Sequence, residues 1–108
     1  MEKPRNENKG PSWARQWTDA QLVLAAILGD LQSFDALALR YRAAAYRVAQ
    51  TVVGNELADD VVQEAATIGL SKFSTFQAGT SFAAWMGRIV HFVARNTQRS
   101  VRRRRTTG

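Results

Sequence analysis

Cysteine is absent from this chain of 108 residues, and histidine occurs once, at His91. These absences exclude disulfides, thiolate metal sites, a cysteine nucleophile and a zinc site built on two histidines. No apolar run approaches the roughly 18 residues that a membrane-spanning helix needs. The polar N-terminus also lacks the apolar segment of a signal peptide. We therefore expect a soluble, cytoplasmic protein with no cofactor and no bound metal.

Other catalytic arrangements are missing as well. Asp60 and Glu64 could share a hard cation, but two carboxylates on one exposed helix make a poor site. Ser71 and Ser74 have no neighbour in the sequence that would activate a nucleophile. Gly79 stands alone rather than in a glycine-rich phosphate loop. The sequence therefore predicts a protein that is not an enzyme.

Acidic residues are absent from the last quarter of the chain. Residues 82–108 carry seven arginines and no Asp or Glu, whereas residues 18–81 carry seven acidic and four basic side chains. Four of these acids fall between Glu56 and Glu64. Such segregation in a small chain indicates two different partners, and the basic end favours a polyanion.

Proline occurs only near the N-terminus, at Pro4 and Pro11, within a segment that also contains Gly10 and two asparagines. Residues 1–17 are therefore predicted to form a flexible leader. Trp13 and Trp17 are unusual in such a segment, and they either dock on the domain or contact a partner.

The rest of the chain shows the spacing of helices and no alternation typical of strands. A capping box at residues 18–21 begins a short helix that Gly29 ends. Longer helices are predicted over residues 31–53, 56–73 and 81–102. The predicted fold class is all-α, a compact bundle of three to four helices with a long basic C-terminal helix, in one domain over residues 18–105.

The predicted helix over residues 56–73 has an apolar arc and an acidic arc. Leu70 projects into the acidic arc beside Gln63. An ordinary solvated face, with acids stabilising the start of the helix, is one interpretation of this arc. A protein-binding face, on which the carboxylates receive Arg or Lys from a partner, is the other.

The last predicted helix carries an arginine stripe. At 3.6 residues per turn, four of its arginines lie within about 60° of each other. Trp85 and Phe92 lie between this stripe and the apolar face, where they either broaden the core or present their rings to bases. A basic stripe edged by aromatic rings can neutralise phosphates and stack on unstacked bases. The stripe consists of Arg88, Arg95, Arg99 and Arg102, and the apolar face of Phe82, Met86, Ile89 and Val93.

Residues 22–105 resemble region 2 of bacterial sigma factors, particularly the extracytoplasmic-function (group IV) type. The matching pieces occur in the order and spacing of that family. They are Gly29-Asp30, Phe34, Leu37, Tyr41-Arg42, the string Ala58-Asp59-Asp60-Val61-Val62-Gln63-Glu64, Phe76, Ser81-Phe82, Trp85-Met86, Arg88-Ile89 and the arginine-rich end.

The resemblance implies an all-α domain with two partners. In this family the acidic helix docks on the clamp helices of the largest catalytic subunits of core RNA polymerase. Here that contact would fall on Asp59, Asp60, Gln63, Glu64 and Leu70.

The second implied partner is promoter DNA, mainly the non-template strand of the −10 element. In the family, a loop captures a base flipped from that element, and the next helix holds the strand and the upstream phosphates. The loop would correspond to Phe76, Gln77, Ala78, Gly79 and Thr80. The helix contacts would correspond to Trp85, Arg88, Phe92, Arg95, Asn96, Arg99, Arg102 and Arg103.

The chain departs from the family pattern in two respects. Phe92 stands where the family often has asparagine, which favours stacking over a polar base contact. The C-terminal helix-turn-helix domain that reads the −35 element is absent from these 108 residues, so we expect an excised first domain rather than a naturally short protein. An anti-sigma factor is a further partner in the family, but no motif in this sequence identifies one.

Two other functions fit part of the sequence. A general nucleic-acid-binding helical module without a polymerase partner explains the arginine stripe but not the acidic patch. A regulatory module that binds only proteins would use the arginines for an acidic partner.

Overall fold

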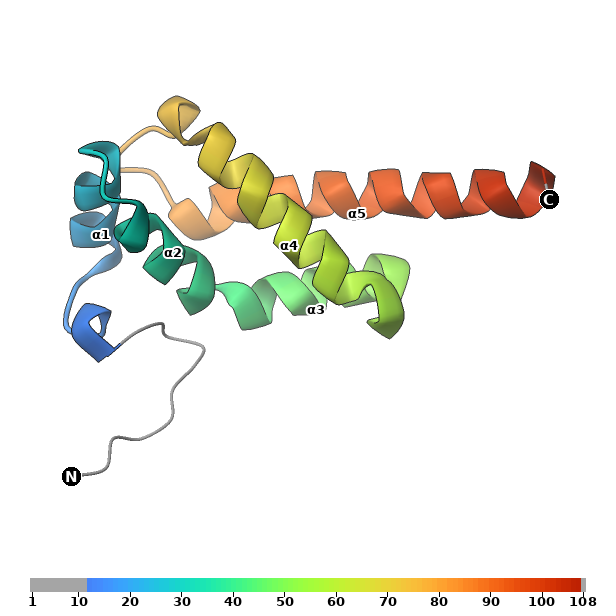
Figure 1. Cartoon of the computed structure of the whole chain (residues 1–108), viewed down its shortest axis with the longest axis horizontal. Coiled ribbons are helices and arrows are strands. Elements are labelled where there is room, and N and C mark those ends of the chain that lie inside the picture. The colour runs from blue at the N-terminus through green and yellow to red at the C-terminus, as the bar shows by residue number, and fades with distance from the viewer. Residues whose placement is uncertain (1–11, 108) are drawn as a thin grey trace, which may run out of the picture.

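Three packed helices form the body of the molecule, and two shorter helices form a hairpin at one end (Figure 1). The computed structural model describes residues 12–107. The body consists of α3 (Arg42–Val53), α4 (Asn55–Ser71) and α5 (Phe82–Thr107), and the hairpin of α1 (Asp19–Ile27) and α2 (Leu31–Arg40). The described residues also include the 3₁₀ turns η2 (Ser12–Ala14) and η3 (Phe73–Thr75). The predicted all-α class is confirmed.

The helix predicted over residues 31–53 is in fact two helices, separated at Tyr41. The Tyr41 hydroxyl donates a hydrogen bond to Asp19 on α1, and its ring lies 5.9 Å from that of Phe82 on α5. With these contacts at the break, α2 packs against α1, whereas α3 packs against α5. The described part of the chain therefore holds five α-helices rather than three or four, because tertiary contacts override the local helical spacing.

The long C-terminal helix begins where the sequence predicts. The Ser81 hydroxyl accepts a hydrogen bond from the backbone N–H of Ala84 at 3.1 Å, as expected for a helix N-cap. The helix then continues to Thr107, five residues beyond its predicted end.

Aromatic rings fill the core where the loop after α4 meets α5. Phe73 and Phe76 stack with their centroids 5.6 Å apart, and Trp85 lies 5.3 Å from Phe76. Phe34 and Phe82 complete the cluster. These five rings, here called the aromatic cluster, join α2, η3, the following loop and the start of α5.

The helices α4 and α5 approach closely at Gly69. A Cβ added to this glycine would lie 2.7 Å from Cε of Met86, so a hydrogen atom is the only side chain that fits without a shift. Along α5, Phe82, Met86 and Val93 are buried and Ile89 is partly buried, in agreement with the predicted apolar face.

Part of the segment before Thr18 packs against the helices. Ala14 is buried, and its carbonyl accepts a hydrogen bond from Arg40 Nη2 at 2.9 Å. Arg40 also pairs with Asp19, at 2.7 Å between Nη1 and Oδ1. Trp13 and Trp17 contact each other edge to face and stay exposed, so they line the surface of this docked segment. Residues 1–11 of the predicted leader lie outside the described residues.

The contact between Tyr41 and Asp19 predicts a dependence of stability on pH. Burial, the hydrogen bond to Asp19 and the charge of that carboxylate raise the pKa of Tyr41 from 10.0 to about 12. Because the unfolded state loses the phenol proton first, this contribution to stability is complete below pH 10 and is lost as the pH rises to about 12. We expect the free energy of unfolding to fall more steeply across this window in the wild type than in Tyr41→Phe. Denaturant titrations at each pH measure the difference, and equal slopes in the two proteins would contradict the raised pKa of Tyr41.

Candidate nucleic-acid and protein interfaces

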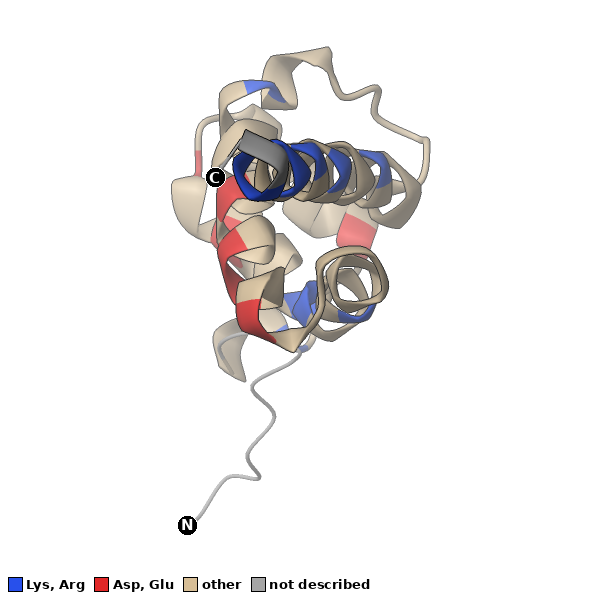
Figure 2. Cartoon of the chain, turned by 90° about the vertical axis from the view of Figure 1, so that its right-hand side faces the viewer, with Lys and Arg blue, Asp and Glu red and all other residues tan. Residues whose placement is uncertain are grey.

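The acidic and basic residues lie on two neighbouring helices of the body. Figure 2 shows the acidic positions along α4 and the basic positions along α5. On α4, the predicted contact residues Asp59, Asp60, Gln63, Glu64 and Leu70 are all exposed. We call these five residues the acidic surface.

A groove of about 320 Å³ lies beside the acidic surface, between α4 and the helices α2 and α3. Arg42 on its edge lies 3.7 Å from Asp59, between Nη2 and Oδ1. Sequence reasoning missed this groove because its walls come from helices that are distant in the sequence. It is lined by Asp35, Ala38, Leu39, Arg42, Val62, Gln63 and Ala66.

The arginines of α5 are exposed, as predicted. Arg95 Nε donates to Nε2 of His91 at 3.1 Å, and Arg99 Nη2 donates to Oδ1 of Asn96 at 2.5 Å. No acidic side chain among residues 12–105 forms an ion pair with Arg95 or Arg99. No neighbouring carboxylate therefore offsets the charge of these two groups, and both lie at the surface, where an anion can reach them. Arg88, Arg102 and Arg103 are exposed on the same helix.

A second groove, of about 300 Å³, lies between α4 and α5. Phe92 forms part of its wall and is 60% exposed, whereas Trp85 is half-buried because its ring also belongs to the aromatic cluster. Two cations, Lys72 and Arg88, lie at the same groove. Sequence reasoning did not identify Lys72, which lies at the end of α4 and becomes a neighbour of Arg88 only in the folded chain. The lining residues are Ile68, Lys72, Trp85, Arg88, Ile89 and Phe92, and we call this the aromatic groove.

The predicted base-capturing loop has one buried and four exposed residues. Phe76 is only 7% exposed and stacks on Phe73, so its ring is not available to a base in this conformation and instead anchors the loop. Gln77, Ala78, Gly79 and Thr80 are exposed. The N–H and the hydroxyl of Thr80 both donate to the carbonyl of Gln77, at 3.2 and 2.6 Å, and Gly79 has a φ of 91°. The positive φ in the third position is the conformation that a type II turn requires.

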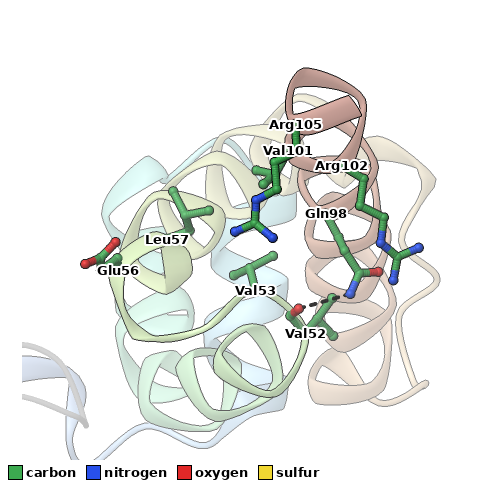
Figure 3. A pocket seen from close by; sticks show the side chains of 8 residues that line it. All are labelled: Val52, Val53, Glu56, Leu57, Gln98, Val101, Arg102 and Arg105. Atoms are coloured by element: carbon green, nitrogen blue, oxygen red, sulfur yellow. Dashed lines mark hydrogen bonds between the residues drawn. The ribbon is translucent and has the colours of Figure 1, made fainter. Parts of the chain in front are cut away.

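A third groove, of about 370 Å³, lies near the far end of α5, where the turn from α3 to α4 meets it (Figure 3). Gln98 Nε2 donates to the Val52 carbonyl at 3.2 Å across this junction. Arg105 points over the apolar side chains of the groove, while Arg102 extends from α5 beside Gln98 (Figure 3). The positive charge of α5 therefore extends past the arginine stripe to the end of the body.

Residues 12–107 contain no group of three or more His, Cys, Asp or Glu side chains placed to hold a metal ion. Within the same range, no helix is both long enough and apolar enough to cross a membrane.

The comparisons with known proteins agree with this geometry. The family model of sigma-70 region 2 matches residues 37–105. The chain belongs to the sigma-70 region 2 family. It is also similar to a solved NMR structure of an engineered region 2 of sigmaE in complex with GTAAAA. That match has a TM-score of 0.78 and 30% sequence identity, and it covers 82% of this chain and 94% of the other. A search of curated proteins found no match.

The family predicted from the sequence is therefore confirmed, and the likeness to sigmaE region 2 supports the extracytoplasmic-function type. Sigma-70 region 2 is a transcription initiation domain that acts in promoter recognition and in binding to core RNA polymerase.

The backbone conformations of Gly79 in the loop and Gly87 in α5 predict opposite effects of substitution by alanine. At Gly79 an added Cβ meets nothing within 4 Å, but the φ of 91° disfavours any L side chain, so Gly79→Ala should lower the free energy of unfolding by about 1 kcal/mol. At Gly87, inside α5, an added Cβ also meets nothing, and Gly87→Ala should raise it by about 0.5–1 kcal/mol. Urea denaturation measures both, and an unchanged stability in Gly79→Ala would contradict the left-handed turn.

Proposed function

We propose that this region 2 domain, of the extracytoplasmic-function type, binds core RNA polymerase through the acidic surface of α4. We further propose that it binds the non-template strand of the promoter −10 element through the loop over residues 76–80 and through α5. The observation that carries the DNA part is the aromatic groove, which combines an exposed phenyl ring with two cations.

The aromatic groove has the chemistry that a single strand requires. Moving a base out of the DNA stack costs a few kcal/mol of free energy. Stacking of that base on an aromatic side chain contributes roughly 1–3 kcal/mol per base, which offsets part of this cost. Phe92 offers such a ring at the surface, and its apolar neighbours Ile68 and Ile89 exclude water from one side of a bound base. Lys72 and Arg88 at the same groove can hold the phosphates on either side of that base.

The turn over residues 77–80 supplies polar groups for reading a flipped base. Gln77 presents an exposed amide, which offers both a donor and an acceptor. The burial of Phe76 fixes the position of this turn relative to Trp85, on the edge of the aromatic groove. The sigmaE relative was solved in complex with GTAAAA, which supports an oligonucleotide ligand for this fold.

The remaining arginines extend the DNA path along α5. Arg95 and Arg99 are one helical turn apart and one to two turns beyond Phe92, with Asn96 between them. Arg102, Arg103 and Arg105 continue the positive charge along the helix. A strand leaving the aromatic groove can therefore keep its phosphates next to guanidinium groups along the exposed length of α5.

The acidic surface supports the polymerase contact. Leu70 is an apolar side chain exposed on the helix that carries Asp60, Gln63 and Glu64. The adjoining groove beside Gln63 can receive a side chain of a partner. An apolar anchor, a neighbouring cavity and a carboxylate rim are the components of a protein-binding site.

Replacing Gln63 and Glu64 with alanine tests the polymerase contact. Both side chains are exposed, so the double variant should fold normally while its affinity for core RNA polymerase falls by about tenfold or more. Binding is measured by fluorescence anisotropy of the labelled chain against purified core enzyme, and circular dichroism confirms the fold. Gln50→Ala with Thr51→Ala, an adjacent exposed pair on α3, is the matched control and should bind as the wild type does. Equal affinity of the two double variants would show that the acidic surface is ordinary solvated surface.

Replacing Arg95 or Arg99 with alanine tests the phosphate contacts. Each variant should weaken binding to single-stranded −10 DNA and to unrelated single strands alike, and should reduce the slope of log affinity against log salt by about 0.7–1. Titrations at four salt concentrations measure the slope. Arg47→Ala removes the same charge from α3 and should leave the slope unchanged. A loss confined to one DNA sequence would contradict a phosphate role for these arginines.

A Phe92→Ala variant separates stacking from charge. It should weaken single-strand binding by about fivefold or more without changing the salt slope, because the exposed ring carries no charge. The same titrations measure both quantities, and a variant that binds as tightly as the wild type would remove the aromatic groove from the DNA path.

A further inference from the structure

We infer that the α1–α2 hairpin carries a second protein-docking surface, which binds an amphipathic helix of another protein with an apolar face and basic flanks. The apolar side chains of this docking surface belong neither to the acidic surface of α4 nor to the DNA path on α5, although Asp35 on its rim also lines the groove beside the acidic surface. The inference rests on four aliphatic side chains that the proposed function does not use.

These four side chains are exposed although they are large and apolar. Leu24 is 58% exposed, Ile27 48%, Leu28 87% and Leu31 62%. The other exposed large hydrophobic residues among residues 12–105 are Leu70 and Phe92, which belong to the proposed function, and the mutually packed Trp13 and Trp17. We call Leu24, Ile27, Leu28 and Leu31 the leucine patch.

The leucine patch spans the end of α1 and the start of α2. Leu24, Ile27 and Leu28 are three and four residues apart, so they form one ridge at the end of α1. Leu31 begins α2 directly after the turn, which is closed by hydrogen bonds from the N–H groups of Gly29 and Asp30 to the carbonyls of Ala26 and Ala25. A helix ridge of this kind packs into the groove between side chains of a second helix. The hairpin lies at the end of the molecule away from the C-terminal end of α5 (Figure 1).

The charges around the leucine patch favour a partner with basic side chains. No Lys or Arg occurs from Gln16 to Leu39, whereas this segment contains three aspartates. Asp19 pairs with Arg40, but Asp30 and Asp35 are exposed. Asp30 immediately precedes Leu31, and Asp35 lies one helical turn after it on α2. Lysine or arginine on the flanks of a docked helix would therefore meet carboxylates at the rim of the patch.

The same aspartates argue against two other occupants. A second copy of the chain, docked symmetrically through the same patch, would bring Asp30 and Asp35 of both copies together, which is unfavourable. An anionic lipid surface would be repelled by these carboxylates in the same way. A basic amphipathic helix would cover the leucine patch with its apolar face and place its cations beside the aspartates of the rim.

The test uses two peptides of about 15 residues with the same leucine face, one with lysine on both flanks and one with glutamate. The full chain should bind the lysine peptide at least about tenfold more tightly than the glutamate peptide. Leu28→Gln with Leu31→Gln should weaken binding of the lysine peptide by about tenfold or more, since both side chains are largely exposed and the fold should be unaffected. Asp30→Asn with Asp35→Asn should remove the preference for lysine flanks. Asparagine at position 30 can still cap α2, as Asp30 does now by accepting from the N–H of Gln32 at 3.1 Å.

A control variant keeps this test separate from the polymerase contact. Gln63→Ala with Glu64→Ala should bind the lysine peptide as the wild type does, and amide chemical shifts should change over residues 24–35 rather than over α4. Equal binding of the lysine peptide by the wild type and by the Leu28/Leu31 variant would overturn the proposal, as would binding that is lost in the Gln63/Glu64 variant. Sedimentation that shows a dimer of the wild type, but not of the Leu28/Leu31 variant, would assign the patch to a second copy and overturn it as well.

Discussion

The aromatic cluster is the contact on which the arrangement of α2, the loop after α4 and the start of α5 depends. Its rings come from three parts of the chain and contact one another. Phe34 belongs to the hairpin, Phe73 and Phe76 to the segment after α4, and Phe82 and Trp85 to the start of α5. Edge-to-face and stacked pairs of this kind add about 0.5–1.5 kcal/mol each beyond the burial of their area. The turn over residues 77–80 is exposed, and buried rings of the cluster, Phe76 and Phe82, lie on both sides of it in the sequence and anchor its two ends.

The cluster also explains why two aromatic residues of α5 have different roles. Trp85 lies within the cluster and presents only one side to the aromatic groove, whereas Phe92, two turns later, is beyond the cluster and is exposed. The same helix therefore begins as part of the core and continues with an exposed aromatic ring at the surface. Its charge changes in parallel, because the first basic residue after Phe82 is Arg88 and the arginines become denser toward the end.

Much of this organisation could be predicted from local sequence signals. The capping box at Thr18 and the Ser81 cap both appear in the structure, and the apolar spacing along α5 identified its buried face.

The break at Tyr41 could not be predicted, since the spacing of apolar residues continues across it and its cause is Asp19, 22 residues earlier in the chain. The burial of Phe76 was missed for a similar reason, because its partners come from α5 and η3. Lys72 and Asp35 became candidates only when folding placed them beside Arg88 and Gln63.

The contact at Gly69 has a mechanical consequence. With no side chain at this position, the end of the Met86 side chain on α5 fits against the backbone of α4. A larger residue at position 69 would have to displace the Met86 side chain or move the two helices apart. The spacing between the acidic surface and the arginine stripe therefore depends in part on a buried glycine that belongs to neither.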